Sequence, residues 1–555
     1  MYPSETLCVP PADLAFLGAT VETITPHPGL PPDAVAVTGG RIVAVGSRAE
    51  VEPLIGSATR VIRLRGETLL PGFEDAHIHP VQGELTVMQC DLNDLEADQF
   101  GAAIADYAAR HPERDWIVGA GWAVTDFPNA APRREDLDAL VPDRPAFLWS
   151  RDGHSAWVNS RALELAGITA ATPDPAGGRI VRDPAGAPSG TLREDAVPLV
   201  EELVPPATAE EHAAALAAVQ RRLHALGITA WQDASVYNPV ACAHQLEAYR
   251  VAAAAGTLQA RVVASSFWDP RLGVEQVERF LEQRASASFG RLRAGTVMIW
   301  VDGVVEGLTA AMLDPFVDEH GRATDNRGLA LVPPEPLRGA VVALDRSGLQ
   351  VHMHAIGDAA VRSALDAIEA ARDANGPSDL RHHIAHIQVI HPGDIPRFAA
   401  LGATANMQPI WACHEPVMDE RTIPFLGPER TSWQYPFSSL ARSGARLAGG
   451  SDWPVTSANP LLEIEVAVTR VSPDARSNPP FEPDEWLSLD EALAAFTIGS
   501  AWVNHLDETG SIEVGKLADL TLLDRNLRQL DESPIGEVRV QGTWVEGLEV
   551  FAAPI

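Results

Sequence analysis

The chain has 555 residues, of which 46% are hydrophobic and 21% are charged, a composition typical of a globular protein larger than one ordinary domain. Its 75 acidic residues outnumber its 42 Lys and Arg, and the formal net charge of −33 makes nucleic acid and anionic membranes unfavourable partners. There is no membrane-spanning apolar stretch and no signal-peptide pattern, and Cys8, Cys90, Cys242 and Cys413 lack CxxC spacing. We therefore expect a cytoplasmic protein without a disulfide framework or a membrane anchor.

Both ends of the chain carry β-strand patterns. Residues 33–47 alternate apolar side chains on either side of a Gly-Gly turn, which predicts a hairpin. Residues 518–524 and 538–547 have the same strand-like character near the C-terminus. We expect these ends to pair, so that residues 1–68 and 507–555 together form a small β-sandwich domain.

Between the two ends, eight short apolar segments each finish in polar residues. They are residues 68–80, 227–235, 260–267, 296–303, 351–358, 381–388, 402–409 and 445–454. The segments between them are long enough for helices, and this alternation predicts an α/β protein of the (β/α)8 TIM-barrel class. We expect the barrel to span residues 69–506.

The segment of about 81–205 is longer than a strand-to-helix connection requires. It contains a passage rich in Pro and Gly at 171–190, and we interpret it as an insertion near the active-site face of the barrel. Directly after it, Thr208 and Glu211 have the spacing of a capping box, which predicts the start of a helix that ends at Gly227.

Candidate metal ligands lie at the ends of four predicted strands. His77 and His79 are two residues apart in an alternating segment, so both imidazoles should point the same way. His354, His386 and Asp452 follow three other strands, and barrel enzymes assemble their sites at strand ends. Imidazole nitrogen and carboxylate oxygen are suitable ligands for Zn²⁺ and related ions. This pattern predicts a divalent metal site.

Strand parity alone does not choose between His352 and His354, or between His382 and His386, because the members of each pair share a strand face. We favour the later residue of each pair because it lies nearer the carboxyl end of its strand. The earlier residues are then expected to be structural or to support the ligands.

Four motifs, PGFEDAHIHP, VHMHAIGD, RHHIAHIQ and AGGSDWP, resemble the signatures of family 3 of the amidohydrolase superfamily, which includes N-substituted formamide deformylases. The segment TGSIEVGKLADLTLLD (509–524) resembles the return of that superfamily into its sandwich domain. The resemblance covers nearly the whole chain. It implies ligation by His77 and His79 from the first strand, His354 from the fifth, His386 from the sixth and Asp452 from the eighth, with Asp452 also taking the proton of the attacking water.

Two further segments resemble family segments near the substrate. They are RDGHSAWVNS (151–160) and WVDGVVEGLTAAM (300–312), which make His154 and Asp302 candidates for orienting the substrate. For each residue, a purely structural role is the alternative.

One position departs from the family pattern. In many relatives the fourth strand carries a lysine, carboxylated by CO2, whose carbamate bridges two metal ions. The matching position here is Met298, and a thioether cannot become a carbamate. Two divalent ions would then face one obvious carboxylate, Asp452, and buried unpaired charge is costly. Glu306 or Asp302 is an alternative source of a second carboxylate.

We therefore expect one ion, most simply Zn²⁺. The expected ligands are His77, His79, His354 and Asp452. His386 is either a further ligand or a hydrogen-bond donor to the substrate carbonyl.

These features predict a hydrolase that cleaves a carbon–nitrogen bond, of the amide or formamide kind, in a small-molecule substrate. Metal-bound hydroxide would attack the carbonyl, and Asp452 would act as the general base. One alternative is a hydrolase of the same fold that acts on an ester, a lactone or an exocyclic amine. Another, suggested by Met298, is a catalytically silent metal-binding barrel. A homodimer is the candidate assembly.

Overall fold

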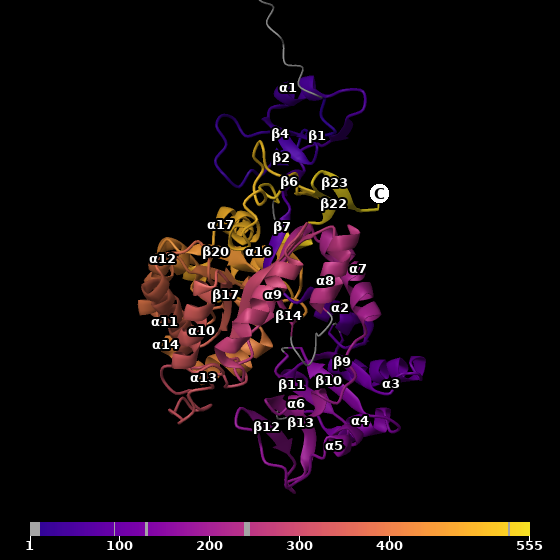
Figure 1. Ribbon diagram of the computed structural model, residues 1–555, viewed down its shortest axis with the longest axis vertical. Helices are drawn as coiled ribbons and strands as arrows, with labels where there is room; N and C mark the ends of the chain where they lie inside the picture. The colour runs from indigo at the N-terminus through magenta and orange to yellow at the C-terminus, as the bar shows by residue number, and fades with distance from the viewer. Residues whose placement is uncertain are drawn as a thin grey trace, which may run out of the picture.

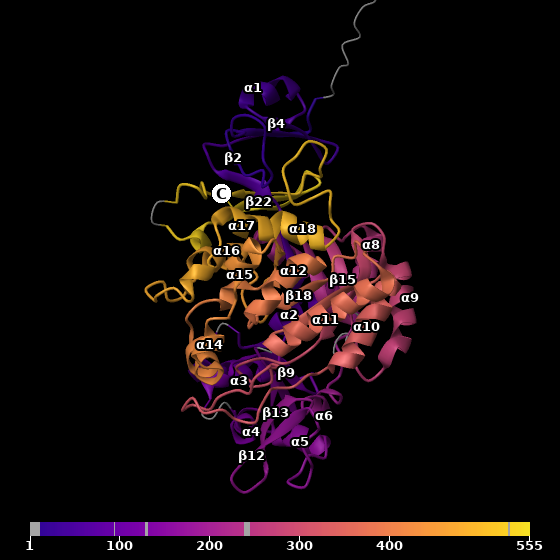
Figure 2. The same cartoon turned by 90° about the vertical axis from the view of Figure 1, so that its left-hand side faces the viewer.

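A computed structural model describes residues 11–93, 95–127, 131–151, 153–237, 245–530 and 533–554, so Cys8 and Cys242 lie outside the described residues. Three bodies follow one another along the long axis of the molecule, and two views agree on their order (Figures 1 and 2). Two small sheets lie at one end, a barrel lies in the middle, and a third, separate sheet lies at the other end.

The barrel consists of eight strands in one sheet, and every neighbouring pair is parallel. The strands are β7 (Phe73–Ile78), β14 (Ile228–Tyr237), β15 (Arg261–Phe267), β16 (Leu292–Trp300), β17 (Gln350–Ala355), β18 (His383–His386), β19 (Thr404–Met407) and β20 (Arg446–Gly449). Each strand overlaps one of the eight predicted segments, although β14 ends two residues later, β16 begins four residues earlier and β17 begins one residue earlier than predicted. The prediction of a (β/α)8 barrel is therefore confirmed.

The chain after β20 runs beside the end of β7 and brings the two edges of the sheet together. The amide of Asp452 donates a hydrogen bond to the carbonyl of His77 at 2.8 Å, and the amide of His79 donates to the carbonyl of Trp453 at 2.9 Å. These two bonds hold the carboxyl ends of the first and last strands in register. The candidate ligands His77, His79 and Asp452 therefore sit on one hydrogen-bonded frame.

Helices pack around the barrel and cover its outer face. The main ones are α7 (Ala209–Ala225), α8 (Gln245–Ala255), α9 (Val277–Ala287), α10 (Pro334–Arg346), α11 (Asp358–Asn375), α12 (Ile395–Leu401), α15 (Phe437–Arg442) and α16 (Pro460–Thr469). The capping box predicted before α7 is present: Oγ1 of Thr208 accepts a hydrogen bond from the amide of Glu211 at 3.2 Å, and Oε2 of Glu211 accepts one from the amide of Thr208 at 2.8 Å.

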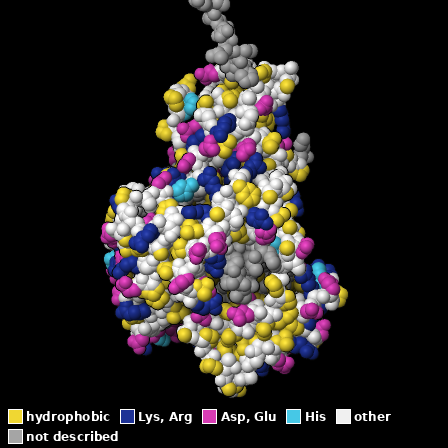
Figure 3. All heavy atoms as spheres, in the orientation of Figure 1, with side chains coloured by type: hydrophobic (Ala, Val, Ile, Leu, Met, Phe, Trp, Pro, Cys, Tyr) yellow, Lys and Arg dark blue, Asp and Glu magenta, His cyan; other side chains and the backbone are white. Residues whose placement is uncertain are grey.

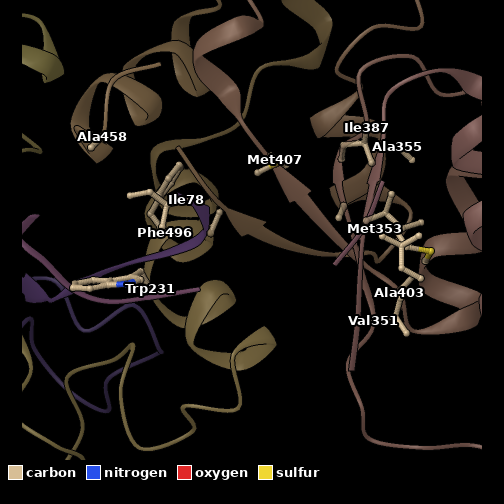
Figure 4. Packing of buried hydrophobic residues seen from close by; sticks show 14 of the residues in the cluster. Ile78, Trp231, Val351, Met353, Ala355, Ile387, Ala403, Met407, Ala458 and Phe496 are labelled. Atoms are coloured by element: carbon tan, nitrogen blue, oxygen red, sulfur yellow. The ribbon is translucent and has the colours of Figure 1, made fainter. Parts of the chain in front are cut away.

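On β17, alternation separates an apolar outer face from a polar inner face. On β17, Val351, Met353 and Ala355 belong to the large hydrophobic cluster between the strands and the helices (Figure 4). The residues between them, His352 and His354, have the opposite parity and point into the barrel. Burial of the apolar face against the helices thus fixes which histidines face the interior.

The two chain ends form two packed sheets, at the top of Figure 1. One sheet contains β1 (Leu14–Leu17), β3 (Ala34–Thr38), β4 (Arg41–Gly46) and β5 (Arg60–Arg63), and the other contains β2 (Thr20–Val21), β6 (Thr68–Pro71), β21 (Leu520–Leu523), β22 (Val540–Val545) and β23 (Leu548–Ala552). Phe16 from the N-terminal part meets Trp544 from the C-terminal part edge to face, with ring centroids 5.0 Å apart. The predicted pairing of the two ends is therefore present.

The segment interpreted as an insertion contains a six-stranded sheet of its own, at the lower end of Figure 1. Its strands are β8 (Cys90–Asp91), β9 (Ile117–Trp122), β10 (Ala146–Ser150), β11 (Ser155–Val158), β12 (Gly178–Arg182) and β13 (Pro188–Glu194), and α3 (Phe100–Arg110), α4 (Arg134–Leu140) and α5 (Ser160–Leu165) lie among them. Two hydrophobic clusters support this sheet. We call this part the inserted domain.

The surface has a mixed character. On the face shown in Figure 3, acidic and basic side chains are interspersed and do not gather into one basic patch. None of the helices in the part of the chain that the structure describes combines the length and the apolar character needed to cross a membrane.

Candidate metal centre

His77, His79 and Asp452 form the most compact group of candidate ligands. Nε2 of His77 lies 3.1 Å from Oδ1 of Asp452, and Nε2 of His79 lies 3.2 Å from the same oxygen. One donor atom from each of the three residues lies within 4.8 Å of the others. Both histidines come from the end of β7, whose alternation directs the two rings the same way.

His354 and His386 lie against this group. The rings of His354 and His386 have centroids 4.4 Å apart, and the ring of His386 lies 4.7 Å from that of His77. The structure therefore brings all five predicted ligands to one region at the carboxyl ends of the barrel strands. His386 and Asp452 have φ angles of 70° and 55°, in a region that residues other than Gly seldom adopt, and strained backbone of this kind is common at functional sites.

The donor set fits a divalent metal ion. Nε2 of His77 and Nε2 of His79 both face Oδ1 of Asp452, and all three side chains are largely buried. A cation held between these three atoms would compensate the desolvation of the buried carboxylate, which is costly without a charged partner. Imidazole nitrogen together with a carboxylate is the ligand chemistry of Zn²⁺ and similar ions.

Electrostatics favour the protonation states that metal ligands need at Asp452, His77 and His386. Burial alone would raise the pKa of Asp452, but the neighbouring His77, His79 and His386 outweigh it and hold that pKa well below its usual range. Burial lowers the pKa of His77, and burial together with the nearby imidazoles lowers the pKa of His386 far more. The ionised Asp452 and the neutral His77 and His386 are thus in the forms that bind a cation. Burial would lower the pKa of His79 as well, but its hydrogen bond to Asp452 and the charge of that carboxylate raise it.

A second layer of polar residues inside the barrel contacts the candidate ligands. Nε2 of His352 lies 2.8 Å from Nδ1 of His77, and the ring of His352 stacks on that of His383 with centroids 3.9 Å apart. Nδ2 of Asn406 lies 3.1 Å from Nδ1 of His383. His352, the earlier member of the first ambiguous pair, therefore contacts the candidate ligand His77.

His382, the earlier member of the second pair, is directed away from the site. Its Nδ1 accepts a hydrogen bond from the amide of Val351 at 3.0 Å, and its Nε2 lies 3.1 Å from Oδ2 of Asp345 on α10. These partners belong to the packing between the barrel and its helices.

Met298 is fully buried in the barrel interior. On β16 it pairs in register with His352, and the adjacent Val297 and Ile299 belong to the outer hydrophobic cluster, so the thioether has the inward parity. Position 298 therefore offers no oxygen ligand at the level of the histidines.

Asp302, predicted to orient the substrate, contacts backbone amides of the protein. It is fully buried, Oδ2 accepts hydrogen bonds from the amides of Ala311 and Gly357 at 2.8 Å each, and Oδ1 accepts one from the amide of Ile356 at 3.0 Å. Oδ1 also lies 3.5 Å from Nδ1 of His354. This carboxylate ties the loop after β16 to the end of β17 and supports His354 from behind.

His154 reaches the barrel from the inserted domain. Its ring lies 6.4 Å from that of His354, and its Nδ1 lies 3.0 Å from Oε2 of Glu194 at the end of β13. Glu194 was not among the predicted site residues. Nothing in the spacing of GTLRE (190–194) indicates a contact with the barrel, because that contact depends on how the inserted domain docks.

Asp75 is a second residue that the sequence analysis missed. Its Oδ1 accepts hydrogen bonds from the amide of His77 at 3.0 Å and from the amide of Ser451 at 3.2 Å, which joins β7 to the segment after β20. Burial raises its pKa to about 7. Strand parity places Asp75 on the same face as His77 and could have indicated it.

A parallel eight-stranded barrel with imidazoles and a carboxylate gathered at the carboxyl ends of its strands defines the class of metal-dependent barrel enzymes. Residues 60–551 match the family model described as "Amidohydrolase family", and the chain belongs to this family. It is a hydrolase.

Two relatives and one solved structure illustrate the similarity. The chain is 33% identical to Protein LONG AFTER FAR-RED 3 of Arabidopsis thaliana, over 97% of this chain and 92% of the relative. It is 30% identical to N-substituted formamide deformylase of Arthrobacter pascens, over 97% of this chain and 98% of the relative. The crystal structure of an uncharacterized metal-dependent hydrolase from Pyrococcus furiosus superposes with a TM-score of 0.71 at 25% identity, and covers 92% of this chain and 99% of that one.

Proposed function

We propose that the protein hydrolyses a carbon–nitrogen bond of an amide or formamide-like small molecule, with one divalent ion, Zn²⁺, held by His77, His79, His354 and Asp452. The observation that carries this proposal is the meeting of two histidine Nε2 atoms on one carboxylate oxygen of Asp452, 3.1 and 3.2 Å away. The similarity to a relative named N-substituted formamide deformylase supports the choice of substrate class.

A divalent ion held by these four residues would lower the pKa of a bound water to about 7 and would polarise a carbonyl group. Asp452, kept ionised by its histidine neighbours, accepts the proton of the attacking water as the general base. His386 donates a hydrogen bond to the carbonyl oxygen as negative charge develops there, and its place in the ring contacts with His77 and His354 supports this role. When the carbon–nitrogen bond breaks, the amine leaves with the proton that Asp452 accepted.

Two features support a single ion. Met298 provides a thioether where a bridging carbamate would be needed, and the oxygens of Asp302 already accept three backbone hydrogen bonds. A second dication would therefore lack the bridging anion that a carbamate at position 298 supplies.

Elemental analysis of the purified protein tests this count, and one zinc per chain is the expected result. The variant Met298→Lys, prepared in bicarbonate, is expected to take up a second ion, because its lysine can be carboxylated. Two ions per chain in the parent protein would overturn the single-ion proposal.

A substrate panel tests the reaction. The metal-loaded protein is incubated with N-benzylformamide, N-acetylbenzylamine, an aryl ester, a lactone and adenine, and the release of amine, carboxylate and ammonia is measured. Release of benzylamine from an amide is the expected result. Release of ammonia, or turnover of the ester or lactone alone, would assign a different bond. No turnover with zinc saturating would favour the silent barrel.

A further inference from the structure

Glu194 joins the inserted domain to the barrel beside the candidate metal centre. Oε2 of Glu194 lies 3.0 Å from Nδ1 of His154, and Oε1 accepts a hydrogen bond from Oγ1 of Thr309 at 3.1 Å. The amide of Glu194 also donates to the carbonyl of His154 at 3.0 Å. His154 and Glu194 belong to the inserted domain, whereas Thr309 belongs to the barrel loop after β16, so one carboxylate connects the two parts.

The pair of His154 and Glu194 is shielded from solvent but faces the metal centre. The two side chains are 18% and 14% exposed, and the ring of His154 lies 6.4 Å from that of His354. Burial would raise the pKa of Glu194, yet His154 and the hydrogen bonds it accepts keep that pKa below its usual value. Glu194 has a φ of 48°, an unfavourable backbone conformation for a residue with a side chain. The structure thus retains a strained backbone at the point where the carboxylate reaches His154.

We propose that Glu194 is a positioning residue of the hydrolytic site, which acts through His154. Its carboxylate accepts a hydrogen bond from the Nδ1–H group of His154 and fixes the ring, so that Nε2 is the nitrogen that hydrogen-bonds the substrate. A carboxylate that holds one nitrogen of a histidine in this way selects the tautomer and the orientation of the ring. Thr309 fixes the other oxygen of Glu194 from the barrel side. The inserted domain therefore completes the active site, and this inference rests on the proposed function.

A double-mutant cycle tests the proposal in the zinc-loaded enzyme. Glu194→Gln removes the charge from the hydrogen bond to His154, and we expect it to lower kcat/KM for N-benzylformamide by about 10- to 100-fold, the loss typical of a charged hydrogen bond. Because Glu194 acts through His154, the double variant with His154→Gln should be no slower than His154→Gln alone. Multiplied losses in the double variant would overturn the proposal.

The same domain offers a matched control. Nδ1 of His111 lies 3.2 Å from Oε1 of Glu113 in a solvent-exposed pair. Glu113→Gln removes an equivalent contact away from the metal centre and should leave kcat/KM unchanged. An equal loss in this variant would overturn the proposal, because the effect would then reflect the inserted domain as a whole.

A measurement without substrate separates this inference from the proposed function. Nitrogen-15 NMR of histidine-labelled protein, with the His154 signals assigned by their absence in His154→Gln, reports which ring nitrogen carries the proton. We expect an Nδ1–H tautomer that changes in Glu194→Gln and stays the same in Glu113→Gln. An Nε2–H tautomer in the parent protein would overturn the proposal. The expected tautomer in a protein that cleaves no amide would overturn the proposed function alone.

Discussion

Two buried carboxyl groups at opposite ends of the barrel show how their neighbours decide the charge of a residue. Asp452 lies at the mouth, where three histidines hold its pKa well below the usual range. Glu74, near the start of β7 at the floor, accepts a hydrogen bond from Oγ1 of Thr509, and burial raises its pKa to about 8. Burial alone would keep both groups neutral. At the mouth, where the strands end, a buried carboxylate is kept charged and can take part in catalysis. At the floor, where the strands begin, a buried carboxyl group is kept neutral.

The largest expected effect comes from the charge at the mouth. Asp452→Asn keeps the shape of the side chain but removes the general base, so kcat should fall by about 10³-fold, which corresponds to about 4 kcal/mol of transition-state stabilisation. The measurement is steady-state kinetics with N-benzylformamide, together with a thermal melt that shows the variant is folded. Asp106→Asn, on the exposed face of α3, should leave kcat unchanged. A loss of less than 10-fold at Asp452 would remove it from the proposed role.

Metal removal should lower the stability of the protein, because the ion binds only the folded site at the mouth of the barrel. An ion that binds the folded site and not the unfolded chain stabilises the fold, so zinc at 100 to 1,000 times its dissociation constant should do so by about 3–4 kcal/mol. Thermal melts of chelator-treated and zinc-loaded protein measure this effect. His79→Gln, which removes one ligand, should show a smaller zinc-dependent shift. Equal melting temperatures with and without zinc in the parent would contradict the proposed site.

Asp302 tests whether every carboxylate near the mouth is catalytic. In Asp302→Asn, an NH2 group replaces one of the two carboxylate oxygens. Whichever oxygen it replaces, it faces a backbone N–H of Ala311, Gly357 or Ile356, so at least one buried donor loses its acceptor. We expect the free energy of unfolding to fall by about 2–3 kcal/mol. Urea unfolding measures this loss. Asp318→Asn is the control, because Oδ1 of Asp318 also accepts backbone hydrogen bonds, but in an exposed turn. Equal costs at both positions would argue against the buried role of Asp302.

The strands of the barrel and the parity of their histidines could be predicted from local pattern alone. Each strand is a short apolar run that ends in polar residues, and alternation fixes which side chains face inward, as at His77 and His79. The chain-end hairpin at Gly39 and Gly40 was equally local, and both residues have a positive φ that favours glycine. These features depend on neighbours in sequence.

The features that could not be predicted depend on residues far apart in the chain. The inserted domain pairs its strands in the order β12, β13, β11, β10, β9 and β8, which no local pattern specifies. The contact of Glu194 with Thr309 joins residues 115 positions apart. Asp302 accepts hydrogen bonds from backbone amides, and every residue type except proline supplies those, so no motif indicates them.

The floor provides the smallest effect and the sharpest contrast with Asp452. Below about pH 4.5, Glu74 is protonated in both the folded and unfolded states. From there to about pH 8 the unfolded state ionises and the folded state keeps its proton, so stability falls as the pH rises. Gln cannot ionise in either state. Between pH 6 and 7, the stability of Glu74→Gln relative to the parent should therefore rise by about 1.4 kcal/mol, measured by urea unfolding at each pH. Glu278→Gln, on the exposed face of α9, should show no such trend. A pH-independent difference for Glu74→Gln would mean that burial does not keep this carboxyl neutral, and the two ends of the barrel would then hold their carboxylates in the same charged state.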